Sequence, residues 1–244
     1  MGRAFEVRAA SMAKTNLMKS KLYSKYGKLI YMEAKNGGYD MDANLKLRAL
    51  VDKAKHDQVP ADVIKRNIEK AKGGTGESYT TCRYEAFGPS ESTFIIEALT
   101  DNSNRTLSAL KSSFAKCGAH MGATGSVSYT YIYEGILSFK GLDEDATLEA
   151  LAEAGFDVND IITEGDSVTV LSKPSDSSDV KATLLKVNPD LEITRDEVIW
   201  VAQNEVSVPE EDFEKINRLL GFLDENDDVT NVYHNISNLP PTED

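Results

Sequence analysis

Apolar side chains in the first 72 residues recur at the spacing typical of helices. Met18, Leu22, Tyr26 and Leu29 lie three or four residues apart, on one face of a helix that is expected to end at Asn36-Gly37-Gly38. Two shorter helices are predicted from the apolar sets Leu47, Leu50, Val51, Ala54 and Ala61, Ile64, Ile68, Ala71. The pattern therefore predicts a helical domain over residues 1–75, and Gly73-Gly74-Thr75-Gly76 is typical of a linker.

From Tyr79 the pattern changes to that of strands. Residues 80–87 and 93–99 are predicted to be strands, and the turn residues Gly88-Pro89-Ser90-Glu91 between them indicate a hairpin. A helix with Leu107, Leu110 and Phe114 on one face is expected next. A glycine-containing loop and a strand over 127–133 follow it.

Residues 135–201 show the order strand, helix, two strands, helix, strand, which is ferredoxin-like. A helix that begins after Pro209 and a strand over 229–233 then close the chain. Because 79–133 has too few helices to cover a sheet face, this tail is expected to complete that domain. The predicted fold class is α+β with three domains: the helical domain 1–75 and two ferredoxin-like domains, with 135–201 inserted into the one formed by 79–133 plus 204–238.

Charge is divided unevenly along the chain. The net charge is −13, yet residues 1–72 hold 16 Lys and Arg against 8 Asp and Glu, and the remainder holds 11 against 32. A basic end on an acidic body indicates an arm that faces nucleic acid. Chance and solvated helix faces are the alternative explanation.

The two cysteines, Cys82 and Cys117, form no CxxC motif, which excludes a disulfide framework or a zinc finger. A reducing cytoplasm is therefore the expected location, where the Asn-x-Ser/Thr sequences at Asn104 and Asn235 would not be glycosylated. No stretch approaches 18 uncharged apolar residues, so no membrane partner is expected.

The glycines at 118, 122 and 125 do not predict a phosphate-binding loop. They follow a helix and precede a strand, whereas a phosphate loop leads from a strand into a helix N-terminus. We interpret Gly118 as a left-handed helix end and the other two glycines as turn residues. Cys117-x-x-His120 supplies only two of the ligands that zinc needs, so His120 is interpreted as a loop histidine.

Five lysines give the strongest binding signal. Their spacings of 7, 4, 3 and 7 residues keep them within about 80° of one another around a helix. They are Lys14, Lys21, Lys25, Lys28 and Lys35, and with Arg3, Arg8 and Lys19 they give a positively charged arm. Such an arm is suited to phosphate backbones and provides affinity more than sequence selection. A lysine-rich solvated face is the alternative.

A second candidate contact lies at residues 101–106, where a strand leads into a helix. Polar side chains at this place cap the helix N-terminus, which also attracts anions. Asn102, Asn104 and Arg105 are the predicted contact residues. Plain capping beside an exposed arginine is the alternative.

Enzymatic motifs are absent from the sequence. It has no nucleophile elbow, Walker lysine loop or HExxH, so no catalytic residue, cofactor or metal site is predicted. The acidic run 224–228 resembles the start of an EF-hand, but Val229 and Asn235 stand where that loop needs Gly and Glu. It is interpreted as a solvated helix end.

Several motifs together resemble the YebC family over nearly the whole chain, and their sequences are most similar to its YeeN branch. They are the Gly2-Arg3 start, Asn44-x-x-Leu47-Arg48, Val59-Pro60, Arg83-Tyr84-Glu85-x-Phe87-Gly88-Pro89, Leu99-Thr100-Asp101-Asn102-x-Asn104-Arg105-Thr106, Gly118-x-x-Met121-Gly122-x-x-Gly125-Ser126-Val127-x-Tyr129 and Val232-Tyr233-His234-Asn235. The chain departs from the family at Phe5-Glu6-Val7, where Trp-Ala-Asn is usual.

The resemblance implies a three-domain protein of the bacterial cytosol without enzymatic activity. Family members are described as probable transcriptional regulators that bind DNA, and others as translational activators at the ribosome. The predicted function is therefore a nucleic-acid-binding regulator of gene expression, acting on DNA or, as the alternative, on ribosomal RNA and the ribosome. A protein-interaction or ligand-sensing module on 135–201 is a second alternative. The oligomeric state is not predicted.

Overall fold

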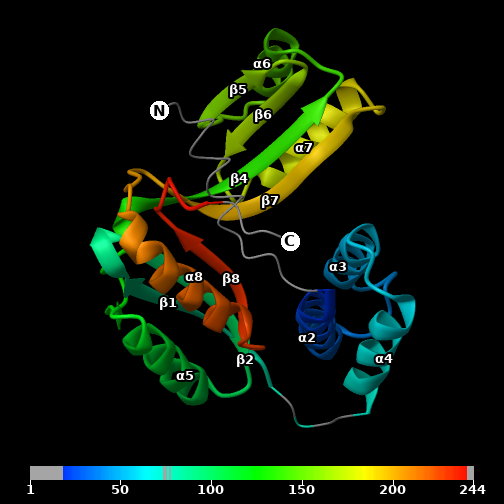
Figure 1. The fold of residues 1–244 in the computed structure, drawn as a ribbon. Helices are drawn as coiled ribbons and strands as arrows, with labels where there is room; N and C mark the ends of the chain where they lie inside the picture. The colour runs from blue at the N-terminus through cyan, green and yellow to red at the C-terminus, as the bar shows by residue number, and fades with distance from the viewer. Residues whose placement is uncertain (1–18, 74–75, 77, 241–244) are drawn as a thin grey trace. The chain divides into compact units, whose positions relative to one another are not determined.

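The computed structural model describes residues 19–73, 76 and 78–240 (Figure 1). These residues form two compact units, one over 128–205 and one that combines 19–127 with 206–240. Among the described residues, the larger unit contains five α-helices and a four-stranded sheet, and the smaller contains two α-helices and a second four-stranded sheet. The α+β fold class, with helices first and antiparallel sheets after them, is confirmed.

Three helices occupy the first part of the larger unit: α2 (Lys19–Gly37), α3 (Leu45–His56) and α4 (Ala61–Lys72). They share a core that includes Tyr26, Ile30, Leu47 and Ile64. Asn44 begins α3 by accepting a hydrogen bond from the Leu47 amide at 3.0 Å, while its own amide donates to the carbonyls of Glu33 and Gly38. The predicted inward residues of α3 are correct, but Ala61 is exposed because it is the first residue of α4.

The sheet of the larger unit has the order β3-β1-β2-β8 and is antiparallel throughout. Its strands are β1 (Thr80–Phe87), β2 (Thr93–Thr100), β3 (His120–Met121) and β8 (Val229–His234). The short 3-10 turn η1 (Pro89–Glu91) joins β1 to β2 as the predicted hairpin. The helices α5 (Ser103–Lys116) and α8 (Glu210–Asp224) cover one face of this sheet (Figure 1).

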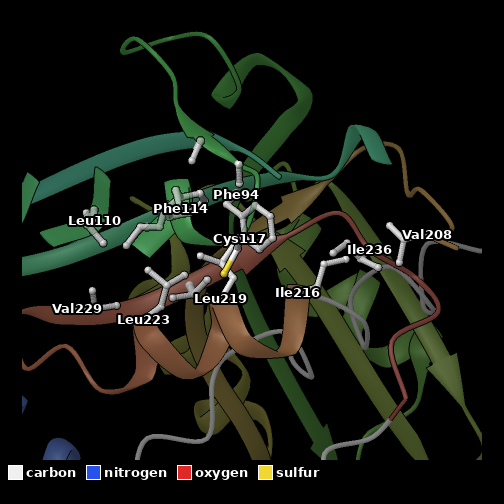
Figure 2. Packing of buried hydrophobic residues seen from close by; sticks show 14 residues of the cluster. Phe94, Leu110, Phe114, Cys117, Val208, Ile216, Leu219, Leu223, Val229 and Ile236 are labelled. Atoms are coloured by element: carbon white, nitrogen blue, oxygen red, sulfur yellow. The ribbon is translucent and has the colours of Figure 1, made fainter. Parts of the chain in front are cut away.

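The core of this layer is built from residues far apart in the sequence. Figure 2 shows Leu219 and Leu223 of α8 near Leu110 and Phe114 of α5, and Ile216 farther along α8 toward Ile236. All of them are buried with strand residues such as Phe94 and Val232. Burial of an apolar side chain of this size stabilises a fold by about 1.5–3 kcal/mol. The segment after residue 205 is therefore an integral part of the sheet domain that begins at Thr80.

Counted from its other edge, the sheet of the larger unit has the strand order β8-β2-β1-β3. The strands β2 and β3 are connected through α5, and β1 lies between them in the sheet. That is the spatial arrangement of a ferredoxin-like sheet. The connectivity differs, because the strand that comes third along a ferredoxin-like chain comes first here as β1.

The smaller unit has the predicted strand and helix order. It consists of β4 (Tyr131–Lys140), α6 (Glu144–Glu153), β5 (Asp160–Glu164), β6 (Ser167–Ser172), α7 (Ser177–Val187) and β7 (Glu192–Ala202). The sheet order β5-β6-β4-β7 is ferredoxin-like, and all neighbouring strands are antiparallel. Leu137, Phe139 and Val170 of the sheet pack against Leu151 of α6 and Leu184 of α7.

The strand predicted over 127–133 as part of the first sheet is wrong. Residues Ser128–Thr130 form a 3-10 turn, η2, and Tyr131 already pairs with Ala202 in the second sheet. β4 then runs without interruption through Gly135. A Cβ at Gly135 would lie 2.8 Å from the Ser177 Cβ, so this glycine allows α7 to approach the strand closely and does not end it.

Candidate nucleic-acid interface

The predicted positively charged arm is only partly within the described structure. Arg3, Arg8 and Lys14 lie outside the described residues, and so do the side chains of Lys19 and Lys21 in α2. The remaining three lysines of α2 have different surroundings, which decide what each charge can contact.

Lys35 and Lys25 differ in exposure. Lys35 is exposed near the end of α2, and its Nζ lies 5.6 Å from the centroid of the Tyr31 ring, within range of a cation–π interaction. Lys25 is half-buried, and its Nζ donates a hydrogen bond to Asn231 Oδ1 at 3.1 Å.

Lys28 is held by the sheet domain through three acceptors. Its Nζ donates to the carbonyl oxygens of Leu99 at 3.1 Å and Asp227 at 3.0 Å, and it forms an ion pair with Asp228 Oδ1 at 3.2 Å. Only 15% of the Lys28 side chain is exposed. The charge of Lys28 is therefore balanced by a carboxylate of the same unit.

The second candidate contact forms at the start of α5. Asn102 is the N-cap, and its Oδ1 accepts a hydrogen bond from the Arg105 amide at 3.0 Å. Asn104 is exposed on the first turn. Arg105 Nη2 lies 2.9 Å from Asp228 Oδ2 and 2.7 Å from Asp101 Oδ1, and hydrogen bonds to these two carboxylates raise the pKa of the guanidinium.

Asp228 therefore joins the two predicted contact regions. Its carboxylate also accepts hydrogen bonds from the hydroxyls of Thr100 at 3.0 Å and Thr106 at 2.8 Å. Burial alone would raise the pKa of this carboxyl, but hydrogen bonds from Arg105, Thr106 and Lys28 outweigh burial and lower it. The site is therefore a buried carboxylate that forms one ion pair with Lys28 of α2 and another with Arg105 of α5.

This arrangement gives the residues of the motif Leu99 to Thr106 a structural role. Thr100, Arg105 and Thr106 surround Asp228, and Asn102 caps the helix. Phosphate contact by Lys28 and Arg105 stays a prediction, and a phosphate would have to compete with Asp228 for both cations.

Sequence reasoning missed Asp228 because it is the last of five adjacent polar residues that together resemble a solvated helix end. Its position directly before the buried strand β8 was the available signal.

The glycine loop is fixed by a second buried carboxylate, Glu85 of β1. Its oxygens accept hydrogen bonds from the amides of Gly125 at 2.9 Å and Val127 at 2.6 Å, and the Glu85 carbonyl accepts from the Gly122 amide. Gly118 and Gly125 have φ values of +70° and +86°, as expected for a left-handed helix end and a turn. Backbone donors that a phosphate loop would offer to a ligand are thus bonded to Glu85.

Within the described part of the chain, neither a metal site nor a membrane-spanning helix is found. Within residues 19–73 and 78–240 there is no group of three His, Cys, Asp or Glu side chains placed to hold a metal ion. His120 is exposed and its ring stacks on Phe87. None of the helices described is both long and apolar enough to cross a membrane.

Family comparisons cover both parts of the chain. Residues 3–74 match the N-terminal domain of the TACO1/YebC proteins, and residues 79–236 match the second and third domains of the same family. The fold is also similar to the crystal structure of a conserved hypothetical protein from Aquifex aeolicus. That protein is 30% identical, with a TM-score of 0.71 over 92% of each chain.

Curated relatives match over almost their full length. A probable transcriptional regulatory protein of Alteromonas mediterranea is 47% identical over 96% of this chain and 98% of its own. Proteins with the same description from Vibrio vulnificus and Vibrio cholerae are 49% and 48% identical over 96% of this chain and 99% and 98% of theirs. With both family models and these relatives in agreement, the chain belongs to the TACO1/YebC family.

Proposed function

We propose that this chain is a non-enzymatic, nucleic-acid-binding regulator of gene expression that acts in the cytoplasm. The names of its relatives are regulatory and not enzymatic, which supports this proposal. The observation that carries it is the charge of the helical part: residues 19–73 hold 13 Lys and Arg against 7 Asp and Glu, in a protein with a net charge of −13.

The proposed contacts are electrostatic. Lys35, together with the other α2 lysines and with Arg3, Arg8 and Lys14, would bind phosphates, and Asn102 and Asn104 would add contacts at the start of α5. Lys28 and Arg105 would contribute to binding only where phosphate displaces Asp228. Contacts to phosphate position a protein on nucleic acid without reading bases, so they fit DNA and ribosomal RNA alike.

Salt dependence tests this proposal. If about six phosphates are engaged on duplex DNA, the logarithm of the association constant should fall against the logarithm of salt concentration with a slope near −5. Fluorescence anisotropy with a labelled duplex and with a ribosomal RNA fragment would give both slopes. Affinity that does not change with salt would contradict the proposal.

A matched pair of variants locates the interface. Lys35→Gln should weaken binding and reduce the slope by about one, since one phosphate contact is lost. Lys111→Gln removes an equally exposed charge from α5, outside the helical part, and should leave both values near those of the wild type. Equal effects of the two variants would show that the helical part has no special role.

The choice between transcription and translation needs a cellular measurement. Crosslinking in living cells, followed by sequencing of the recovered nucleic acid, would distinguish the targets. A consistent set of promoter fragments would support a DNA-binding transcriptional regulator, and ribosomal RNA fragments would support the ribosome alternative.

A further inference from the structure

The helical part contains a cavity of about 430 Å³ between α2 and α4. This volume lies within the range of sites that hold small ligands. Residue 27, which lines the cavity, is glycine, and a Cβ there would lie 2.8 Å from Asn67 Nδ2 of α4. Glycine costs about 1 kcal/mol in a helix interior, and close approach of α2 to α4 accounts for its presence.

The lining of the cavity is both basic and aromatic. Among the described residues, the lining includes three cations and three tyrosines but no carboxylate: Lys28, Arg66, Lys70, Tyr23, Tyr31 and Tyr79. In a chain with 40 Asp and Glu, a lining of this kind favours an anionic ligand.

The aromatic rings and the cations are arranged together. Tyr31 is buried and meets Tyr79 edge to face, with ring centroids 6.0 Å apart. Lys70 Nζ lies 5.7 Å from the Tyr31 centroid, and Lys28 Nζ lies 5.6 Å from the Tyr79 centroid. The ring contacts position both lysines before any ligand binds, and Lys28 is also held by its hydrogen bond to Asp228.

Two lining residues are available to a ligand. Tyr23 is half-buried, so part of its side chain is accessible, and Arg66 is exposed on α4. Within the described residues, the Arg66 guanidinium has no ion-pair partner. A planar group could therefore stack near Tyr23 while an anion binds Arg66.

We propose that this cavity binds one unpaired nucleotide of a single-stranded nucleic acid. The base packs against Tyr23 and its phosphate pairs with Arg66. Aromatic stacking of a base together with cationic contact to phosphate is the general way in which proteins bind single strands. The inference rests on the proposed function, and it adds a preference for single-stranded over duplex nucleic acid.

Two variants and their controls test the cavity. Arg66→Gln and Tyr23→Leu should each weaken binding of a labelled single-stranded 12-mer about tenfold, while duplex affinity changes less than twofold. Lys65→Gln removes a charge from the neighbouring exposed position of α4, which does not line the cavity, and Tyr39→Leu removes an exposed tyrosine elsewhere. Both controls should stay within twofold of the wild type on the single strand.

A second readout reports on the base itself. A 12-mer with 2-aminopurine at one position should change its fluorescence on binding the wild type, because the base leaves its stacked neighbours, and should change little with Tyr23→Leu. Parallel 12-mers of RNA and DNA show which polymer supplies the nucleotide.

The outcomes separate this inference from the proposed function. If the wild type binds single strand and duplex equally and Arg66→Gln behaves like Lys65→Gln, the cavity proposal is overturned and the basic surface remains. If neither polymer binds, both proposals are overturned.

Discussion

At the scale of single residues, the Asp228 carboxylate connects α2 with α5. It balances Lys28 and Arg105 and accepts hydrogen bonds from two threonines, with 10% of its side chain exposed. Removing one partner of a buried ion pair is costly because the other charges stay buried without compensation.

Asp228→Asn should therefore lower the free energy of unfolding by about 2 kcal/mol. The expected loss is below that of a fully buried pair, since Arg105 is 55% exposed. Urea denaturation followed by circular dichroism would measure it. Asp227→Asn is the matched control: its side chain is exposed and only its carbonyl contacts Lys28, so a change within about 0.5 kcal/mol is expected. Equal losses in the two variants would refute the role assigned to the Asp228 carboxylate.

His234 makes stability depend on pH. Burial of its ring lowers the pKa to about 4 from the ordinary value of 6.5, and its Nδ1 accepts a hydrogen bond from the Ile236 amide at 3.2 Å. Between pH 6.5 and 4 the unfolded chain takes up a proton at this histidine that the folded chain does not. The free energy of unfolding should therefore fall as pH falls through this window, by at most about 1.4 kcal/mol per pH unit from this group.

Urea denaturation at pH 7.5, 6.5, 5.5 and 4.5 would show this dependence. His234→Gln should have a shallower loss of stability across the window, because it has no imidazole to protonate. His120→Gln, which changes an exposed histidine, should keep the wild-type slope. Identical slopes for all three proteins would show that His234 does not set the pH dependence.

At the scale of elements, one glycine just after α5 and one inside α8 predict effects of opposite sign. Gly118 follows α5 with φ of +70°, a conformation that an alanine adopts only with strain, whereas Gly221 lies inside α8 with open space around it. Gly118→Ala should lower the free energy of unfolding by about 1 kcal/mol, and Gly221→Ala should raise it by about 0.5–1 kcal/mol. Thermal unfolding would show one midpoint decrease and the other increase. A shift in the same direction for both would contradict this assignment.

Local patterns predicted most elements, and long-range contacts decided the rest. The helical spacing of Leu47, Val51 and Ala54 was sufficient for α3, because one buried face determines the period. The predicted domain boundary between residues 133 and 135 was wrong, because β4 continues through Gly135, whose close contact is with Ser177, 42 positions later. Asp228 and Glu85 were missed as binding partners for the same reason: their ligands come from other elements, and periodicity carries no information about such contacts.

At the scale of the whole molecule, charge is separated between the parts of the chain. Residues 128–205 contain 5 Lys and Arg against 17 Asp and Glu, in contrast to the basic helices over 19–73. A nucleic acid bound through the basic helices is a long polyanion. Acidic residues of the same protein should therefore oppose its binding wherever salt does not screen them.

The exposed face of α6 tests this opposition. Asp145, Glu149 and Glu153 lie four residues apart on that face, and all three are exposed. The triple variant Asp145→Asn, Glu149→Gln, Glu153→Gln should bind a nucleic acid about threefold more tightly at 10 mM salt, where the Debye length is about 30 Å. At 150 mM, with a Debye length of about 8 Å, the difference should largely disappear.

The control Asp145→Glu, Glu149→Asp, Glu153→Asp keeps every charge and should match the wild type at both salt concentrations. An unchanged affinity of the neutralised variant at 10 mM would show that the acidic unit does not oppose binding. A gain that persists at 150 mM would instead indicate a direct contact of α6 with the nucleic acid.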